Sequence, residues 1–327
     1  MSQIITAADI ADAAETIRGV AVRTPLLEFM PLNAAVKRRV LVKFEGAQHT
    51  GSFKFRGAYN RLSRIEETRR GAGVVAWSSG NHAQGVAAAA RMLKMRATIV
   101  MPSDAPAVKL ANTRALGAEI VSYDRQSESR EEIATAIARN RGAVLVPSFD
   151  DPFIMAGQGT VGLEIMQQSR EIGLDIESVL VCCGGGGLVS GVATAVKDLD
   201  SGVSIYSVEP EGFDDTARSL VTGKRESVKT GFQSICDALL APMPGEITFP
   251  VNRHLLSGGL VVSDAQVKEA MRFAFEKLKL VVEPGGAVAL AAALNGLAPV
   301  SEGPLAIVVS GSNVDPEMYA AIIAQAI

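Results

Sequence analysis

Residues 178–196 have the sequence SVLVCCGGGGLVSGVATAV, and this stretch decides the fold. The apolar run from Ser178 to Cys183 predicts a short buried strand, and the small apolar residues from Leu188 to Val196 predict a helix. Between them, Gly184, Gly185, Gly186 and Gly187 allow backbone amides to point into the loop, where the helix N-terminus adds a partial positive charge. The pattern predicts a phosphate-binding loop. A tight turn without chemistry explains the four glycines equally well on their own.

Lys54 lies in the second informative stretch, GSFKFRGA at residues 51–58. A lysine flanked by Phe53 and Phe55 is either desolvated for Schiff-base chemistry or extends its amine to solvent from an ordinary helix. The glycine loop favours the first interpretation, because it would hold the phosphate of a cofactor with which the amine condenses. Together the two stretches indicate pyridoxal phosphate. The loop lacks a Walker lysine and dinucleotide-binding glycine spacing, which argues against an oxidoreductase.

With these motifs and four others in order, nearly the whole chain resembles the fold-type II pyridoxal-phosphate enzymes, in particular the threonine/serine dehydratases and serine racemases. The matching stretches are TGSFK at 50–54, SSGNH at 78–82, AGQGT at 156–160, the glycine loop at 184–187, EPGGA at 283–287 and SGSN at 310–313. The resemblance implies an α/β architecture of two domains, with parallel sheets flanked by helices and the cofactor in the cleft between the domains.

Strand and helix patterns alternate along the chain, as this architecture requires. We expect strands at 74–77, 98–101, 120–123, 144–146, 179–182, 204–208 and 305–309, and helices at 7–17, 82–92, 108–116 and 131–139. The resemblance implies a discontinuous large domain, residues 1–64 and 148–327, into which a small α/β domain, residues 65–147, is inserted.

Composition narrows the class of protein. The 327 residues are 48% hydrophobic and 20% charged, which allows a large core and one or two domains. A net charge of −3 and 5% aromatic residues argue against nucleic-acid binding. No long apolar stretch or signal peptide is indicated, so we expect no membrane association and a cytoplasmic location. The three cysteines, Cys182, Cys183 and Cys236, are predicted to be buried and reduced.

The resemblance assigns roles around the cofactor. Lys54 would bind pyridoxal 5'-phosphate covalently and, once displaced by an amino acid, remove the proton from the substrate α-carbon. Phe53 would pack on the pyridine ring, Gly184–Gly187 and Leu188 would hold the phosphate, and Ser310 would face the pyridine nitrogen. A serine there can leave that nitrogen neutral, which favours rapid loss of a β-leaving group over a long-lived carbanion. Arg56 is expected to be an ion-pair or surface residue.

The stretch Ser78-Ser79-Gly80-Asn81-His82 falls between a predicted strand and a predicted helix, where hydroxyls, amides and the helix N-terminus can receive the substrate carboxylate. Helix capping is the alternative for Ser79 or Asn81. By resemblance, Asn81 bonds the phenolic oxygen of the cofactor. Ser79 faces the α-carbon opposite Lys54, and its presence keeps racemisation open as a side reaction.

Glu209, the Phe213 carbonyl and Asp215 match positions at which some relatives bind a divalent cation, which makes Mg²⁺ or Ca²⁺ a candidate ligand here. Solvated loop carboxylates are the alternative. None of the three histidines has a partner at metal-ligand spacing.

Two residues bear on the substrate. Arg130 matches a family arginine near the cleft mouth that could bind a second carboxylate, which would suit a 3-hydroxyaspartate; a surface arginine is the alternative. Ala238 stands where many relatives have glycine, and its methyl group would narrow the space beside the cofactor, which puts a threonine assignment in doubt.

The resemblance predicts an ammonia-lyase that converts a hydroxy amino acid to a 2-oxo acid and ammonia. L-Threonine and L-serine are the expected substrates. Two alternative substrates are L-threo-3-hydroxyaspartate and a hydroxylated amino acid from the catabolism of hydroxyectoine. Racemisation of serine is an alternative reaction. A β-replacement synthase, separable by a sulfide-trapping assay, and a non-catalytic cofactor-binding protein are the rival classes. A small amino acid is the expected partner, and a homodimer the expected assembly.

Overall fold

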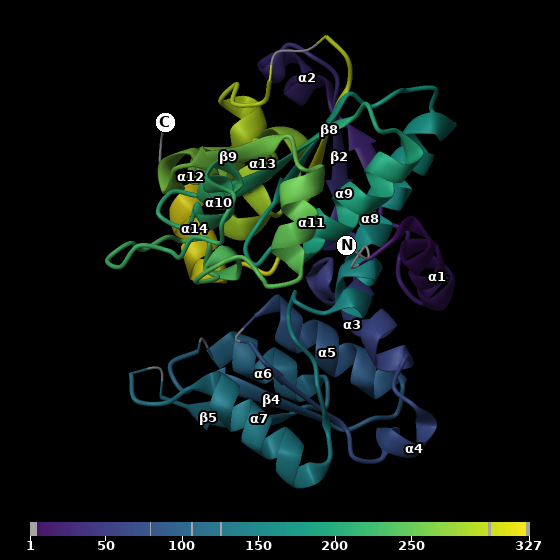
Figure 1. Cartoon of the computed structure of the whole chain (residues 1–327). Coiled ribbons are helices and arrows are strands. Elements are labelled where there is room, and N and C mark those ends of the chain that lie inside the picture. The colour runs from purple at the N-terminus through teal and green to yellow at the C-terminus, as the bar shows by residue number, and fades with distance from the viewer. Residues whose placement is uncertain (1–4, 79, 106, 125, 300–301, 325–327) are drawn as a thin grey trace.

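The structure is a computed structural model of the chain that describes residues 5–78, 80–105, 107–124, 126–299 and 302–324. Two sheets form two lobes, shown one above the other in Figure 1. The larger sheet has the strand order β1-β2-β10-β7-β8-β9, and the smaller has the order β5-β4-β3-β6. Every neighbouring pair is parallel except β1 with β2, which is an antiparallel pair at the sheet edge. The predicted α/β class with parallel sheets is confirmed.

The six-stranded sheet consists of β1 (Leu26–Glu28), β2 (Val40–Phe44), β7 (Ser178–Cys182), β8 (Ser204–Pro210), β9 (Gly258–Val262) and β10 (Leu305–Val309). The helices of this lobe are α1 (Ala7–Ile17), α2 (Met30–Val36), α8 (Pro152–Glu171), α9 (Gly187–Leu199), α10 (Asp215–Thr222), α11 (Thr248–Leu255), α12 (Asp264–Phe273), α13 (Pro284–Leu294) and α14 (Pro316–Ile323). Short turns of helix lie at η1 (Glu45–Ala47), η2 (His49–Gly51), η3 (Asp237–Leu239) and η4 (Ala274–Leu278).

The four-stranded sheet consists of β3 (Val74–Trp77), β4 (Ala97–Pro102), β5 (Glu119–Tyr123) and β6 (Val144–Leu145). Its helices are α4 (Glu67–Arg70), α5 (Asn81–Met92), α6 (Ala107–Ala115) and α7 (Arg130–Arg141). Alternate residues of β3 enter opposite cores: Val74 and Ala76 pack with α5, whereas Val75 packs with Ala134 of α7. Both faces of this sheet are therefore covered, as expected for parallel strands.

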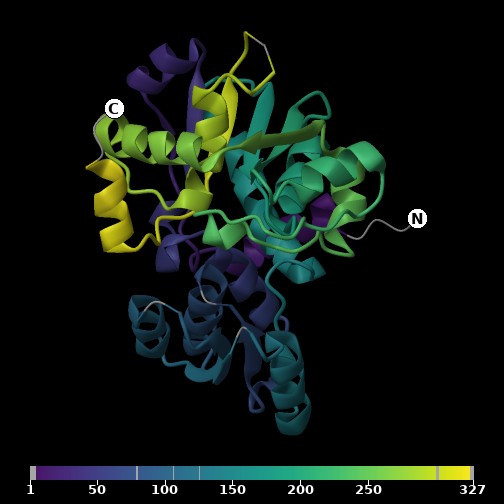
Figure 2. The same cartoon turned by 90° about the vertical axis from the view of Figure 1, so that its left-hand side faces the viewer.

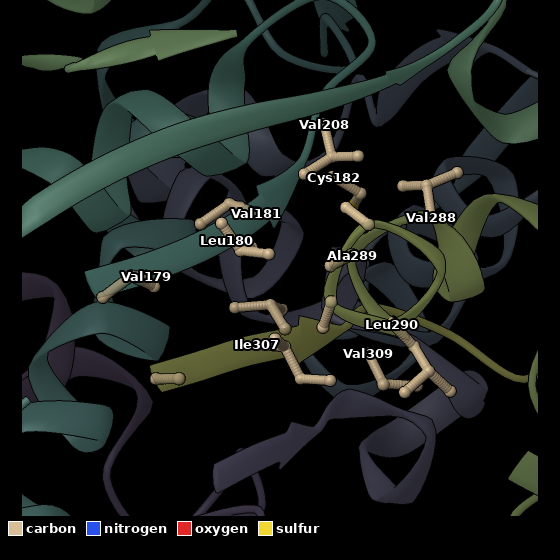
Figure 3. Close-up of a cluster of buried hydrophobic side chains, with 14 of the residues drawn as sticks. Val179, Leu180, Val181, Cys182, Val208, Val288, Ala289, Leu290, Ile307 and Val309 are labelled. Carbon is tan, nitrogen blue, oxygen red and sulfur yellow. The ribbon is translucent and has the colours of Figure 1, made fainter. Parts of the chain in front are cut away.

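Helix α13 is apolar on all sides, and such a helix is stable only when it is buried. Its residues from Pro284 to Ala293 are all buried. Figure 3 shows Val288, Ala289 and Leu290 of this helix against strand residues of the larger sheet, including Ile307 and Val309 of β10. Burying one valine, leucine or isoleucine side chain stabilises the folded state by roughly 1.5–3 kcal/mol. Helices α8 and α9, which pack on each other, lie on the other side of the sheet (Figures 1 and 2).

Helix α3 (Lys54–Ser63) joins the two lobes. Its Phe55, Ala58 and Leu62 belong to the same core as α5 and the four-stranded sheet. On its other side the helix lies against α8, where a Cβ atom on Gly157 would come within 2.6 Å of the Gly57 Cα. The glycines of the AGQGT motif thus serve close helix packing. The proposed domain limits at 64/65 and 147/148 stay a prediction.

Among the described residues, no helix combines the length and apolarity needed to cross a bilayer.

Candidate active site

Lys54 is the first residue of α3, and its amine turns toward the segment that re-enters the larger lobe. The Nζ atom donates a hydrogen bond to the Ser148 carbonyl at 2.7 Å and lies 5.2 Å from the centre of the Phe53 ring. The Phe53 amide in turn donates to the Ser310 carbonyl at 3.1 Å. Desolvation lowers the pKa of Lys54 to about 8, so a larger fraction of its amine is neutral and nucleophilic near neutral pH.

The glycine loop follows β7 and opens α9, as predicted. Gly186 has a φ of +94°, a conformation that favours glycine. A Cβ atom on Gly185 would lie 2.4 Å from the Phe149 ring, and one on Gly187 would lie 2.9 Å from the Phe149 Cβ. Within the described residues, no backbone hydrogen bond uses an amide of 184–188 as its donor. Five amides and a helix N-terminus are therefore available to an anion, and the loop fits a phosphate group.

Side chains of α9 and of the start of α11 hold this loop from behind. The Thr248 hydroxyl donates to the Gly185 carbonyl at 2.7 Å, and the Ser190 hydroxyl donates to the Gly186 carbonyl at 2.6 Å. The Asp150 carboxylate accepts the amides of residues 246–248, where α11 begins. Sequence reasoning missed these supports, because Asp150 and Thr248 carry no motif and meet the loop only in the folded chain.

Ser310 follows β10 and meets the end of the neighbouring strand β7. It is 4% exposed, and its side chain is close enough to lower the pKa of the Cys182 thiol, which burial raises to about 11 overall. The three cysteines are all free and buried, as predicted. Cys182 and Lys54 are close enough for their charges to affect each other's pKa. The structure therefore brings Ser310 and Lys54 to the same end of the sheet.

Asn81 begins α5, with Gly80 immediately before it, and ties the two lobes together. Its Nδ2 donates to Glu283 Oε1 at 2.6 Å, while its Oδ1 accepts from Asn313 Nδ2 at 2.7 Å. The Gly80 amide donates to the Ser78 hydroxyl at 3.2 Å. Ser79 lies outside the described residues, so its predicted role stays a prediction.

His82 is a buried residue whose Nε2 bonds the Val146 carbonyl at 2.9 Å, while its Nδ1 has no partner in the structure. Desolvation, with the charge of Lys54, lowers the pKa of His82 to about 3. The ring is therefore neutral, and the Val146 carbonyl fixes its orientation; its predicted contact with the substrate stays a prediction.

Glu283 is a site residue to which sequence reasoning assigned no role. It precedes α13 and is 3% exposed. Desolvation and the charge of Asp237 together raise its pKa to about 7, against the opposing effect of the hydrogen bond from Asn81. Its charge also raises the pKa of Lys54. A titratable carboxyl thus lies near the amine. The EPGGA motif marked the position without indicating its chemistry.

Ala238 and Arg130 lie in different places. Ala238 is exposed on η3, and its Cβ would be 3.2 Å from a Cβ placed on Gly285. Arg130 lies at the start of α7 in a hollow of about 280 Å³ that it shares with Tyr123 and Glu128. No contact of the described residues links Arg130 to Lys54.

Leu188 is buried in the larger core, so only its amide is available to a ligand.

Glu209 and Asp215 lie close together where α10 begins, and Phe213 precedes this helix by two residues. The Glu209 carboxylate accepts the amides of Thr216 and Ala217 at 2.9 and 2.7 Å. The Oδ2 atom of Asp215 is buried and has no hydrogen-bond partner among the residues that the structure describes. Desolvation, followed by the charge of Asp215, raises the pKa of Glu209, and desolvation raises that of Asp215 to about 7. No cluster of three or more histidine, cysteine or acidic side chains suited to a metal ion occurs in the described part of the chain.

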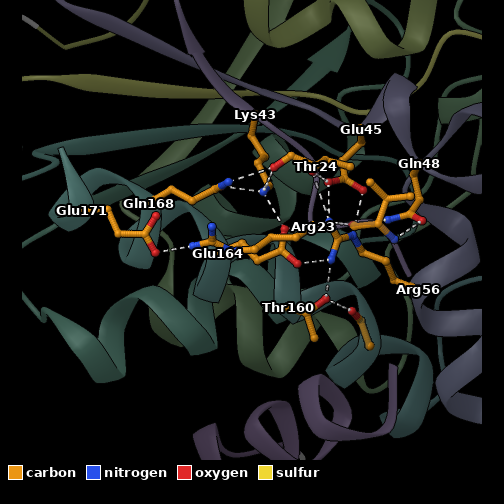
Figure 4. Close-up of polar contacts among 12 residues, drawn as sticks. Arg23, Thr24, Lys43, Glu45, Gln48, Arg56, Thr160, Glu164, Gln168 and Glu171 are labelled. Atoms are coloured by element: carbon orange, nitrogen blue, oxygen red, sulfur yellow. Dashed lines mark hydrogen bonds and ion pairs between the residues drawn. The ribbon is translucent and has the colours of Figure 1, made fainter. Parts of the chain in front are cut away.

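Arg56 anchors the helix that carries Lys54. Its guanidinium donates to Glu45 at 2.8 Å and to Glu164 at 2.7 Å, and Glu164 also pairs with Lys43 at 2.6 Å (Figure 4). Arg56, Glu45 and Lys43 are 0% exposed. Of the two expectations for Arg56, the structure shows the ion pair. This network fixes α3 to β2 and α8.

Comparison with known proteins also indicates a pyridoxal-phosphate enzyme. Residues 17–311 match the family model described as "Pyridoxal-phosphate dependent enzyme". The chain is 45% identical to an L-threo-3-hydroxyaspartate ammonia-lyase of Pseudomonas sp over 96% of this chain and 97% of that one. It is 39% identical to the enzyme of the same name from Saccharomyces cerevisiae, over 97% of this chain and 96% of that one.

Among solved structures, maize serine racemase superposes with a TM-score of 0.91 at 37% identity, covering 96% of this chain and 95% of that one. The match extends over both sheets, so the likeness is not confined to the glycine loop. The chain is a pyridoxal-phosphate-dependent enzyme of the family that includes hydroxyaspartate ammonia-lyases, threonine dehydratases and serine racemases.

Proposed function

We propose that this enzyme is an ammonia-lyase that removes the β-hydroxyl and amino groups of L-threo-3-hydroxyaspartate, giving a 2-oxo acid and ammonia. The observation that carries the proposal is the 45% identity, over almost the full length of both chains, to a lyase of that name. From the sequence alone, L-threonine and L-serine are the expected substrates, and this substrate is one of the alternatives. The order is now reversed, and L-threonine and L-serine remain secondary substrates.

Pyridoxal 5'-phosphate fits the residues of this site, because a desolvated lysine amine and five free amides lie at one end of the sheet. When bound, this cofactor supplies an aldehyde that reacts with amines and a ring that withdraws electrons from the substrate α-carbon. Lys54 would hold it covalently, the loop at 184–188 would hold its phosphate, and Phe53 and Ser310 would contact its ring.

Lys54 is proposed to act twice, first as the attachment point and then as the base that removes the α-proton through Nζ. Its pKa of about 8 suits this exchange, because both protonation states are accessible near neutral pH. Asn81, held by Glu283 and Asn313, would orient the phenolic oxygen. Ser78, Gly80 and the start of α5 would receive the substrate carboxylate.

A divalent cation, Mg²⁺ or Ca²⁺, is proposed to bind Glu209, the Phe213 carbonyl and Asp215. The support is chemical: a buried, unpartnered Asp215 oxygen and a second buried carboxyl, Glu209, whose pKa is raised, would both be stabilised by a cation. A rise in thermal stability on adding Ca²⁺, absent in Asp215→Asn, is the expected result. Equal stability with Ca²⁺ and with a chelator would refute the site. The homodimer and the cytoplasmic location stay predictions.

The attachment can be tested by reducing the protein with borohydride and mapping the modified peptide by mass spectrometry. We expect the pyridoxyl group on Lys54. In parallel, release of ammonia and 2-oxo acid from L-threo-3-hydroxyaspartate should disappear in Lys54→Ala. Label on another lysine, or wild-type turnover in Lys54→Ala, would refute the assignment.

A further inference from the structure

An ion pair joins the two lobes at η3, next to the phosphate loop. Lys109 lies on α6 of the four-stranded lobe, and its Nζ pairs with Asp237 on η3 of the larger lobe. The side chain of Lys109 is 17% exposed, and that of Asp237 is 51% exposed. A pair with so exposed a partner is weak, because water and salt compete with it. Lys109 can therefore exchange Asp237 for another carboxylate at small cost.

The position of η3 places this pair beside the reacting groups. A Cβ on Gly184, in the phosphate loop, would lie 3.2 Å from the Leu239 Cα. On the other side, Gly285 of α13 approaches Ala238. Glu283, two residues before Gly285, bonds Asn81, and its pKa responds to the charges of both Lys109 and Asp237. The η3 turn therefore lies between the phosphate loop and the residues that hold Asn81.

Several other cations of this region are committed elsewhere. Lys43 and Arg56 are held inside the buried network, and Arg61 pairs with Asp151 at 2.8 Å. Arg130 lies in its own hollow at the start of α7. Lys109 thus combines a position beside η3 and the phosphate loop with a partner from which it can separate at small cost.

We propose that Lys109 is the specificity residue of this enzyme and binds the carboxylate on the β-carbon of an acidic hydroxy amino acid, which displaces Asp237. This inference rests on the proposed function and deepens it, since it states which chemical class of substrate the cleft selects. The displacement keeps the charge balance around Lys109, because one carboxylate replaces another. A substrate without a second carboxylate leaves the Lys109–Asp237 pair intact.

The test compares L-threo-3-hydroxyaspartate with L-serine in Lys109→Met, with Arg130→Met as the matched control. Lys109→Met should lower kcat/KM for hydroxyaspartate by about 10- to 100-fold, the range of a charge-assisted hydrogen bond, and change that for serine by less than about 3-fold. Lys109→Arg should recover much of the loss. Equal losses for both substrates would mean that the pair serves only to hold the lobes together, and would overturn the proposal. A selective loss in Arg130→Met instead would also overturn it.

Binding without turnover separates this proposal from the proposed function. Succinate has two carboxylates on a four-carbon chain, and butyrate has one on a chain of the same length. Calorimetry should give tighter binding of succinate than of butyrate to the wild-type holoenzyme, and Lys109→Met should remove the difference. Failure of the wild type to release ammonia would refute the lyase, whereas this binding preference would still support Lys109. An unchanged preference in Lys109→Met would overturn the inference.

Asp237→Asn provides a change in the opposite direction. Because it removes the competing carboxylate and keeps the shape of the side chain, it should bind succinate a few-fold more tightly than the wild type. Weaker succinate binding in Asp237→Asn would contradict the exchange of partners.

Discussion

Replacing Arg56 by methionine should lower the free energy of unfolding by about 3–5 kcal/mol, the cost of removing one partner from a buried ion pair. The wild-type network is neutral, since Arg56 and Lys43 face Glu45 and Glu164. Methionine keeps the apolar stem but leaves two carboxylates with a single ammonium. Arg56 also donates a charge-assisted hydrogen bond to the Thr160 hydroxyl at 3.2 Å, and the loss of this bond adds to the cost.

Urea denaturation followed by circular dichroism measures this loss directly. Arg39→Met is the matched control, because its pair with Glu28 has side chains that are 51% and 26% exposed. So exposed a pair contributes little to stability, because water and salt screen it. The double variant Arg56→Met with Glu45→Gln should recover part of the loss, since it restores one cation to one anion. If Arg56→Met costs no more than Arg39→Met, the network does not hold α3 as we argue.

The remaining predictions concern the site itself. The rate at which the cofactor-free protein takes up pyridoxal phosphate should rise through about pH 8, because the lowered pKa of Lys54 leaves its amine neutral above that pH; an inflection above pH 10 would contradict this. Gly185→Ala should weaken cofactor retention on dialysis, since its Cβ would lie 2.4 Å from the Phe149 ring; full retention would show that the loop yields. Glu283→Gln should raise the stability of the cofactor-free protein at pH 8 but not at pH 4. Burial raises the pKa of the folded carboxyl to about 7 from an ordinary value of 4.5, so wild-type stability falls as pH rises between these values, by roughly 3 kcal/mol. Urea titrations at the two pH values check this, and an equal effect at both would refute it.

The parts that could be predicted from the sequence are those with local signals. Alternating strand and helix patterns gave the parallel sheets, and the glycines after β7 gave the loop. Helix α8 was not predicted, because Gly157, Gly159 and Gly162 lower its helix propensity. The helix tolerates these glycines because α3 and α9 pack too closely against it to leave room for side chains. Gly162, for example, lies against the backbone of Val192. The antiparallel strand β1 has only 3 residues and gave no pattern.

The polar partners in the site could not be predicted in the same way. Asn81 and Glu283 are 202 residues apart, and Lys109 and Asp237 are 128 apart. Each is an ordinary polar residue in its own stretch of sequence. Only the folding of the two lobes against each other gives these residues their partners, because a hydrogen bond between distant segments leaves no periodic signal. Motifs located the site, whereas its electrostatics came from tertiary structure.

The central claim is tested most directly by an absorbance titration of the purified protein with L-threo-3-hydroxyaspartate, L-threonine and L-serine, while 2-oxo acid is measured in the same cuvette. We predict a band of lysine-bound pyridoxal phosphate that shifts on addition of hydroxyaspartate, together with release of 2-oxo acid at a higher kcat/KM than from the other two. A colourless protein that pyridoxal phosphate cannot reconstitute, or a spectral shift without release of oxo acid from any of the three, would contradict the account.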